Sequence, residues 1–354
     1  MIKKVLIVDD SALMRRVESD IINADDNFIV EDVARNGEEA LRKIEDGGAY
    51  DMIITDLNMP KMGGVSFLRE MERLHNRIPV LVVSSIASKS ADETIEALAL
   101  GAFDFVKKPS GPIGQGYVEF EKRILTRIYV ACGLQPKVPE PVKKEEEKEC
   151  VEKRVMTVSR ADKSRLVVIA SSTGGPKALQ SVVPYFPANF PYPIVIVQHM
   201  PAGFTSSLAS RLNELSPLRV KEAEDGEKLR KGYIYIAQGG KQCELLEPQL
   251  GQFVFSVNNK PARGGLRPCA DIFFESLVDT SLNDFVCGVL TGMGSDGCKG
   301  IQLMKKHKRA KVVAQNEATC VVYGMPRAVT EAGVVNEVVP LSEMANTMIK
   351  QLGV

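Results

Sequence analysis

The sequence predicts an α/β protein made of two doubly wound units, each with a mostly parallel sheet. Short apolar runs alternate with amphipathic helical patterns over residues 1–125, and the same alternation returns over residues 161–354. Residues 133–160, between them, are rich first in proline and then in mixed charge. Such a segment buries too little surface to offset its ordering entropy, so we expect a flexible charged linker, with a short charged helix as the alternative.

The N-terminal domain has five predicted strands separated by helical patterns, which favours a (βα)5 unit with helices on both faces of a parallel sheet. The apolar runs are residues 4–10, 27–34, 51–57, 79–85 and 102–109. The clearest helical patterns are residues 11–22, 38–45 and 117–132.

The C-terminal domain repeats this pattern and adds a hairpin. The apolar runs are residues 165–170, 192–199, 232–237, 284–292 and 310–315. Residues 243–259 read as two strands joined by a tight turn, so we expect the second sheet to be mixed.

Composition excludes several classes of protein. The 354 residues carry equal numbers of acidic and basic side chains, which gives no electrostatic case for binding nucleic acid. The seven cysteines form no CxxC pairs, which argues against a disulfide framework or a structural zinc site. The apolar run near the start is too short for a signal peptide, and no stretch reaches the roughly 20 apolar residues of a membrane span. We therefore expect a cytoplasmic protein without membrane insertion.

Acidic side chains gather at the predicted strand ends of the N-terminal domain. Asp9 and Asp10 follow the first apolar run, and Asp56 follows the third. Since the carboxyl ends of parallel strands share one edge, these carboxylates would repel one another without a cation between them. Oxygen ligands suit Mg²⁺, and a carboxylate beside Mg²⁺ can accept a phosphoryl group. Ser84 and Lys108 end the fourth and fifth runs, where a hydroxyl and an ammonium can contact phosphoryl oxygens.

Each of these residues alone would be read as a helix cap or turn residue, but five suitable side chains in the right order favour a site. With the Asp-Asp pair, the segment DLNMPKMGG and the Lys-Pro pair at 108–109, residues 1 to about 120 resemble a two-component receiver domain. That resemblance implies that Asp56 is the phosphoacceptor. It also implies that Asp10, Asp56 and the carbonyl of Asn58 hold Mg²⁺, that Asp9 assists, and that Phe105 is the family's switching aromatic residue.

The stretch LVVIASSTGGPKALQ, residues 166–180, could contain either a capping serine or a nucleophile. A nucleophilic serine needs a general base, usually histidine. Of the three histidines, His75 lies at a polar corner of the first domain and His307 in the charged run KKHKR. His199 directly follows an apolar run, as the serines do, and Asp296 lies in a glycine-rich turn after another run. A serine, a histidine and an aspartate thus occur at three strand-to-loop junctions that could converge on one sheet edge.

The glycines of both turns fit this interpretation. STGGP places a serine in a tight turn with proline at the first helical position, so backbone N–H groups at the helix start can face a developing oxyanion. The turn TGMGSDG can supply a second donor. The order Ser-His-Asp, without GxSxG, disfavours a lipase-like α/β-hydrolase. A capping serine and a histidine in the core are the alternatives that the residues leave open.

A receiver, a charged linker and the motifs SSTGGP, VQHMP and LTGMGSDG together resemble the chemotaxis response-regulator protein-glutamate methylesterases of the CheB type. Alignment on STGGP then implies that Ser172, rather than Ser171, is the nucleophile. By the same resemblance His199 is the base and Asp296 is the acid that orients it.

The resemblance also implies an oxyanion hole made by the backbone amides of Thr173 and Met293. The chain departs from the family pattern at Ala170 and Ser171, just before the nucleophile. It departs again at Cys269, where a serine is common.

The CheB resemblance implies hydrolysis of γ-glutamyl methyl esters on chemoreceptor cytoplasmic helices, and deamidation of receptor glutamines, without a cofactor. A chemotaxis histidine kinase would phosphorylate Asp56, and the unphosphorylated receiver would cover the catalytic edge.

Three other functions fit parts of the sequence. A non-catalytic output domain would use the serine turn to hold an anion while it binds a partner. A transcription factor would need a basic recognition helix, which the sequence does not show. A cysteine hydrolase would need a nearby histidine for Cys269, Cys287 or Cys298, and none has one in sequence.

Overall fold

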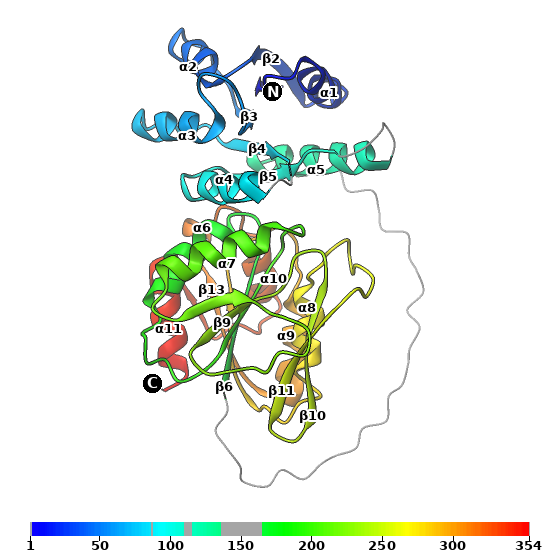
Figure 1. Cartoon of the computed structure of the whole chain (residues 1–354), viewed down its shortest axis with the longest axis vertical. Coiled ribbons are helices and arrows are strands. Elements are labelled where there is room, and N and C mark those ends of the chain that lie inside the picture. The colour runs from blue at the N-terminus through cyan, green and yellow to red at the C-terminus, as the bar shows by residue number, and fades with distance from the viewer. Residues whose placement is uncertain (1, 86–87, 110–114, 136–164, 354) are drawn as a thin grey trace.

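The computed structural model describes residues 2–85, 88–109, 115–135 and 165–353. Two α/β domains are stacked along the long axis of the molecule, with the N-terminal domain at the top of Figure 1. Apart from residues 133–135, the predicted linker lies outside the described residues. Among the helices described, none has the length and apolar character needed to span a membrane.

The N-terminal domain contains a parallel five-stranded sheet in the order β2-β1-β3-β4-β5. Its strands are β1 (Lys3–Val8), β2 (Phe28–Ala34), β3 (Met52–Asp56), β4 (Val80–Ser84) and β5 (Asp104–Lys107). Its helices are α1 (Ala12–Asn23), α2 (Gly37–Glu45), α3 (Gly64–Arg73), α4 (Ser88–Ala99) and α5 (Gln115–Ala131). Side chains of α1 and α5 pack on one face, and those of α2, α3 and α4 on the other, as the (βα)5 prediction requires.

Local chemistry sets where these elements begin. The Ser11 side chain accepts a hydrogen bond from the Met14 amide at 3.4 Å, and the Asn36 side chain accepts one from the Glu39 amide at 3.0 Å. These caps satisfy backbone donors at the starts of α1 and α2. Strands β3 and β4 are buried along their whole length because helices cover both faces of the sheet, and they therefore read as continuous apolar runs.

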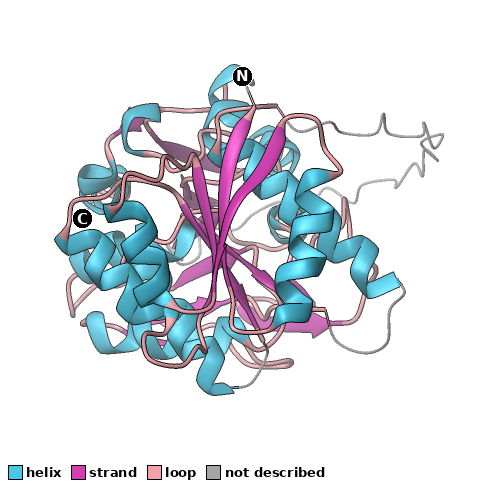
Figure 2. Ribbon diagram, turned by 90° about the horizontal axis from the view of Figure 1, so that it is seen from above, coloured by secondary structure: helices cyan, strands magenta, loops and turns pink. Residues whose placement is uncertain are grey.

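The C-terminal domain is built on a seven-stranded sheet in the order β14-β13-β12-β6-β7-β9-β8. Its strands are β6 (Arg165–Ser171), β7 (Ile194–Gln198), β8 (Arg219–Glu222), β9 (Tyr233–Ile236), β12 (Asp284–Val289), β13 (Arg309–Gln315) and β14 (Glu337–Val339). Its helices are α6 (Gly175–Val182), α7 (Phe204–Leu215), α8 (Ala270–Ser276), α9 (Cys298–His307), α10 (Met325–Glu331) and α11 (Met344–Gln351). Figure 2 shows strands in the middle of the molecule with helices on both sides.

Strand β6 is the centre of this arrangement. It lies between β7 and β12. On one side the chain order runs outward through β12, β13 and β14, and on the other side β7 is followed by β9 and then by β8 at the edge. In doubly wound sheets, ligands bind in the crevice at the carboxyl ends of the strands where the order reverses. The loops after β6, β7 and β12 therefore lie where a site is expected.

The prediction of a hairpin is confirmed, but the prediction that it makes the main sheet mixed is wrong. Strands β10 (Gln242–Gln249) and β11 (Gln252–Asn258) form a separate antiparallel sheet, and every strand pair of the seven-stranded sheet is parallel within the described residues. The two hairpin strands satisfy each other's backbone groups. Cys243 and Phe255 on their buried face pack into the core with α8, so the hairpin attaches through side chains.

The two domains share an interface. Helix α4 lies across α6 and α7 in Figure 1, and apolar side chains of all three helices belong to one core cluster. At the edge of this interface the Thr173 hydroxyl, just after β6, donates a hydrogen bond to Asp104 at 2.7 Å. The N-terminal domain thus covers part of the carboxyl edge of the C-terminal sheet.

Candidate active site

The three predicted catalytic side chains come from neighbouring strand ends of the C-terminal sheet. Ser172 follows β6, His199 follows β7, and Asp296 lies in the turn between β12 and α9. The His199 amide donates to the Ser171 carbonyl at 3.0 Å, and the Ser172 amide donates to the Thr291 carbonyl at 3.0 Å. Ser172 therefore lies between the loops that carry the histidine and the aspartate.

The His199 imidazole is fixed by Asp296. Its Nε2 atom lies 2.6 Å from Oδ2 of Asp296, and the two side chains are only 8% and 7% exposed. Asp296 also accepts hydrogen bonds from the amides of Ala270 (2.6 Å) and Asp271 (3.0 Å) at the start of α8. Burial by itself would raise the pKa of this carboxyl, but the imidazole, a thiol and the amide donors outweigh it and hold the pKa well below its ordinary value. Asp296 is thus an ionised acceptor bound at Nε2, which leaves Nδ1 of the imidazole to bind another group.

Two turns bring backbone amides to the neighbourhood of Ser172. Within the described part of the chain, the amides of Thr173 and Met293 have no hydrogen-bond acceptor. Gly174 has a left-handed φ of 76°, which lets the chain turn directly after Thr173. A Cβ on Gly292 would lie 2.9 Å from Cβ of Ser172, so the second turn packs closely against the predicted nucleophile. This arrangement supports the predicted oxyanion hole.

A buried polar network, which no sequence pattern revealed, holds these loops together. Gln198 is 2% exposed, and its Oε1 atom accepts a hydrogen bond from the Ser171 hydroxyl at 2.6 Å. Its Nε2 atom donates to the Ser172 carbonyl at 2.9 Å. The Thr291 hydroxyl donates to the Thr173 carbonyl at 3.0 Å. Ser171 is therefore a fully buried structural residue, which supports the choice of its neighbour as the nucleophile.

The thiols of the rival cysteine hydrolase are buried. Burial, followed by the nearby Asp296 charge, raises the pKa of Cys269 to about 12, and burial also raises the pKa values of Cys287 and Cys298. Since the thiolate is the reactive form, these are poor nucleophiles. Cys269 instead donates from Sγ to Oδ1 of Asp296 at 3.1 Å. The residue that departs from the family pattern is thus part of the group that holds the acid.

The carboxylates of the N-terminal domain meet at the carboxyl edge of their own sheet. Ligand oxygens of Asp9, Asp10 and Asp56 all lie within 4.8 Å of one another. The Lys108 ammonium lies 2.8 Å from both Asp9 and Asp56. Burial raises the pKa of Asp56, and Lys108 offsets this only in part. A donor set made only of oxygens, with excess negative charge, is of the kind that suits Mg²⁺.

The other predicted residues of this site are tied to α4. The Thr94 hydroxyl of α4 donates to the Ser84 hydroxyl at 3.0 Å, and the side-chain amide of Asn58 donates to the Ser90 hydroxyl of α4 at 3.3 Å. Phe105 is buried at the domain interface, with its ring centroid 4.6 Å from that of Phe204. One helix therefore contacts both the phosphoacceptor site and the C-terminal domain.

The two remaining histidines lie away from the candidate active site. His75 follows α3 in the N-terminal domain. His307 is the last residue of α9, and this helix of ten residues separates it from Asp296 by roughly 15 Å.

Comparisons with known proteins identify the family. Residues 167–348 match the family model described as CheB methylesterase, and residues 5–113 match the one described as response regulator receiver domain. A protein of Syntrophomonas wolfei named "Protein-glutamate methylesterase/protein-glutamine glutaminase 1" is 42% identical over 360 residues, which cover 99% of each chain. The chain belongs to the CheB methylesterase family.

Other CheB proteins agree with this. A Bacillus subtilis "Protein-glutamate methylesterase/protein-glutamine glutaminase" is 41% identical over 348 residues, covering 97% of this chain and 96% of its own. The crystal structure of the Thermotoga maritima CheB methylesterase catalytic domain aligns with a TM-score of 0.51 at 41% identity, covering 53% of this chain and 99% of that one. The predicted family, the receiver domain and the class of enzyme, an ester hydrolase, are thereby confirmed.

Proposed function

We propose that this CheB protein hydrolyses γ-glutamyl methyl esters on the cytoplasmic helices of chemoreceptors, and deamidates receptor glutamines, when a chemotaxis histidine kinase has phosphorylated Asp56. The names of its relatives support the substrates. The observation that supports this chemistry is the His199–Asp296 pair, which lies on the loops after β7 and β12, the strands on either side of the strand that leads to Ser172. We place the enzyme in the cytoplasm, with the kinase and the receptor domains that it would meet.

The first half of the reaction forms an acyl-enzyme. The Ser172 oxygen attacks the ester carbonyl carbon while its proton moves to Nδ1 of His199. The carbonyl oxygen becomes an anion, which the amides of Thr173 and Met293 stabilise; losing one such donor typically costs roughly 10²–10³-fold in rate. The bond to the methoxy oxygen then breaks, and methanol leaves with the proton from His199.

The second half releases the glutamyl side chain. A water molecule attacks the acyl carbon and gives its proton to His199, and Ser172 leaves with that proton, so the product is a carboxylic acid that ionises in water. A glutamine side chain follows the same path with ammonia as the leaving group. The residues at this edge supply nucleophile, base and oxyanion donors, so we propose no cofactor for the esterase.

The receiver controls access to this edge. Asp9, Asp10, Asp56 and the carbonyl of Asn58 would hold Mg²⁺, which would screen the negative charge of the incoming phosphoryl group. Asp56 would receive the phosphoryl group from the kinase, and Ser84 and Lys108 would contact its oxygens. Ser84 accepts a hydrogen bond from Thr94 of α4, and α4 packs on α6 and α7. A phosphoryl group that contacts Ser84 would therefore disturb α4 and weaken its contact with the catalytic domain.

Methanol release from methylated receptor, with and without a small phosphodonor such as acetyl phosphate, tests this function. We expect release by the wild type, more release with the phosphodonor, and none above background with Ser172→Ala. A truncated chain of residues 160–354 should release methanol faster than the unphosphorylated whole protein. Methanol release by Ser172→Ala at the wild-type rate would support the non-catalytic alternative. Equal rates for the truncated and the whole chain would rule out inhibition by the receiver.

A further inference from the structure

We propose that the face of α6 and α7 covered by α4 is the docking surface for the substrate helix, and that α4 occupies it as a substrate-like helix. This inference rests on the proposed function, since it assigns the receptor to this face. It adds where the receptor binds and which features of a helix the surface selects.

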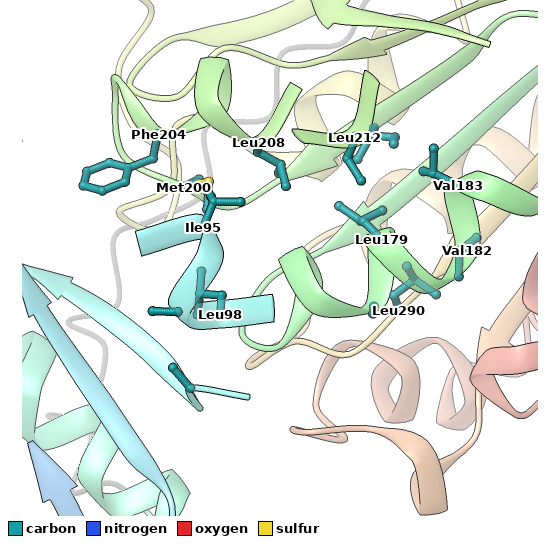
Figure 3. Close-up of a cluster of buried hydrophobic side chains, with 14 of the residues drawn as sticks. Ile95, Leu98, Leu179, Val182, Val183, Met200, Phe204, Leu208, Leu212 and Leu290 are labelled. Atoms are coloured by element: carbon teal, nitrogen blue, oxygen red, sulfur yellow. The ribbon is translucent and has the colours of Figure 1, made fainter. Parts of the chain in front are cut away.

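The apolar part of the surface already holds a helix. Helix α4 contacts both α6 and α7. Ala91, Ile95 and Leu98 of α4 are each 2% exposed, and they belong to a cluster that joins the core of the receiver to Leu179 of α6 and Leu208 of α7. Figure 3 shows Ile95 and Leu98 on the side of α4 that faces the C-terminal domain. Their spacing of four and three residues is one face of an amphipathic helix, which is how a helix binds in a groove between two others.

The polar part of the surface lies next to the nucleophile. The Thr173 hydroxyl donates to the carboxylate of Asp104 at 2.7 Å, and Thr173 directly follows Ser172. Arg127 holds the same carboxylate from the receiver side at 3.0 Å. The receiver therefore presents an apolar helix face with a carboxylate close to Ser172. A glutamyl helix that enters the site must present the same two features.

The charges around α4 agree with an acidic partner. Its remaining face carries Asp92, Glu93 and Glu96, and of these Glu96 is paired with Arg69 of α3. Lys177 of α6 is exposed, and its Nζ atom lies 3.4 Å from the position of a Cβ on Gly101, just beyond the end of α4. A receptor segment rich in glutamate would find this lysine at the rim of the groove.

Release of the receiver leaves a surface that needs a partner. Phe204 is fully buried, and its ring packs on Phe105 of the receiver. Without the receiver that face of the ring, together with its apolar neighbours, would be open to water, and contiguous apolar patches of this kind mark interaction sites. One surface that binds either α4 or the receptor makes the two mutually exclusive, which is a physical basis for inhibition.

The test compares two substrates in the phosphorylated full chain. The variants are Phe204→Ala and Lys177→Glu, with Lys231→Glu as a control at an exposed lysine in the loop before β9. The substrates are a methylated receptor cytoplasmic fragment and the γ-methyl ester of N-acetylglutamate. We expect the ratio of kcat/KM for receptor to kcat/KM for the small ester to fall about tenfold in both variants, the loss of one strong contact, and to stay at the wild-type value in the control. Measurable hydrolysis of the small ester shows that each variant is folded.

Two outcomes separate the docking surface from the proposed function. If Phe204→Ala and Lys177→Glu release the unphosphorylated enzyme from inhibition but keep the wild-type ratio when phosphorylated, the face binds only the receiver and the inference is overturned. If the wild type hydrolyses the small ester but releases no methanol from methylated receptor, the proposed substrate itself is wrong.

Discussion

The two domains place their chemistry at the same position of the same kind of sheet, yet they treat buried carboxylates in opposite ways. In the receiver, Asp56 shares one lysine with Asp9, and burial raises its pKa. In the catalytic domain, Asp296 has the imidazole, a thiol and two backbone amides around its two oxygens, and its pKa is lowered despite burial.

The difference shows that donors, and not burial, decide what a carboxylate at a strand end can do. The carboxylate cluster of the receiver is only partly neutralised by Lys108, so it would attract a cation, and in our proposal that cation lets an anionic phosphoryl group approach. The chemistry of this site therefore depends on a partner. The fully satisfied carboxylate of the catalytic domain holds a histidine in place and needs none.

Ser172→Ala gives the largest expected effect, because it removes the proposed nucleophile of the catalytic domain and leaves the receiver site intact. We expect kcat for methanol release to fall by about 10⁴–10⁶-fold. Phosphorylation of Asp56 by acetyl phosphate, followed on a phosphate-affinity gel, should proceed as in the wild type. Loss of both activities together would mean that the edges are not independent.

Asp296→Asn tests whether the satisfied carboxylate acts only through His199. The amide cannot accept all the hydrogen bonds that the carboxylate accepts, so the imidazole loses its orientation, and kcat should fall by about 10³–10⁴-fold. The KM for receptor should change little, because the carboxylate does not contact substrate in the proposed mechanism. A rise in KM with an unchanged kcat would instead assign Asp296 to substrate binding.

Asp56→Asn tests the carboxylate cluster of the receiver, whose chemistry would depend on a cation and a phosphodonor. The amide cannot form the acyl phosphate, so acetyl phosphate should no longer stimulate methanol release, and a stimulation of about 5–150-fold in the wild type would be lost. The matched control is Asp10→Asn, which should weaken the response to Mg²⁺ concentration but keep the phosphoacceptor. Stimulation that persists in Asp56→Asn would place the phosphoryl group elsewhere.

Sequence patterns predicted the strands that lead to the two candidate sites because these strands are fully buried. Strands β6, β7 and β12 read as continuous apolar runs, and only one of three histidines follows such a run in the second domain. The edge strands β8 and β14 were missed, since β8 has one valine among three charged residues and β14 has only three residues, too few to give such a pattern.

Gln198 and Thr291 were missed for another physical reason. Their partners lie far away in sequence, and a buried polar residue has no local signature of its bonds. The hairpin was predicted from its alternation, but alternation does not say which sheet a hairpin joins.

Cys269 offers a smaller and sharper test of the donor argument. Cys269→Ala removes one donor from Oδ1 of Asp296, and a hydrogen bond of about 1 kcal/mol predicts a roughly fivefold lower kcat. Cys269→Ser restores a donor of similar shape and should return kcat to at least the wild-type value. If serine and alanine behave alike, the thiol only fills space beside the acid.

The buried carboxyl of Glu18 in the receiver should affect the stability of the fold, and it should have the smallest effect on activity. It is 1% exposed on α1, and its two carboxyl oxygens have no hydrogen-bond partner among the described residues. Burial, and next the charge of Asp9, raise its pKa well above the ordinary value of 4.5. The folded protein therefore keeps this proton to a higher pH than the unfolded chain, and the free energy of unfolding should decrease as pH rises from about 4.5 to the raised pKa.

Glu18→Leu should remove both the unsatisfied group and this pH dependence, and should raise the free energy of unfolding at pH 8 by about 1–3 kcal/mol. Urea unfolding followed by circular dichroism at pH 6 and pH 8 measures the difference, with Glu121→Leu at an exposed position of α5 as the control. If Glu18→Leu is less stable than the wild type at pH 8, the carboxyl has a partner in solution. The Glu18 carboxyl would then be stabilised as Asp296 is in the catalytic domain, by hydrogen-bond donors rather than by a bound proton.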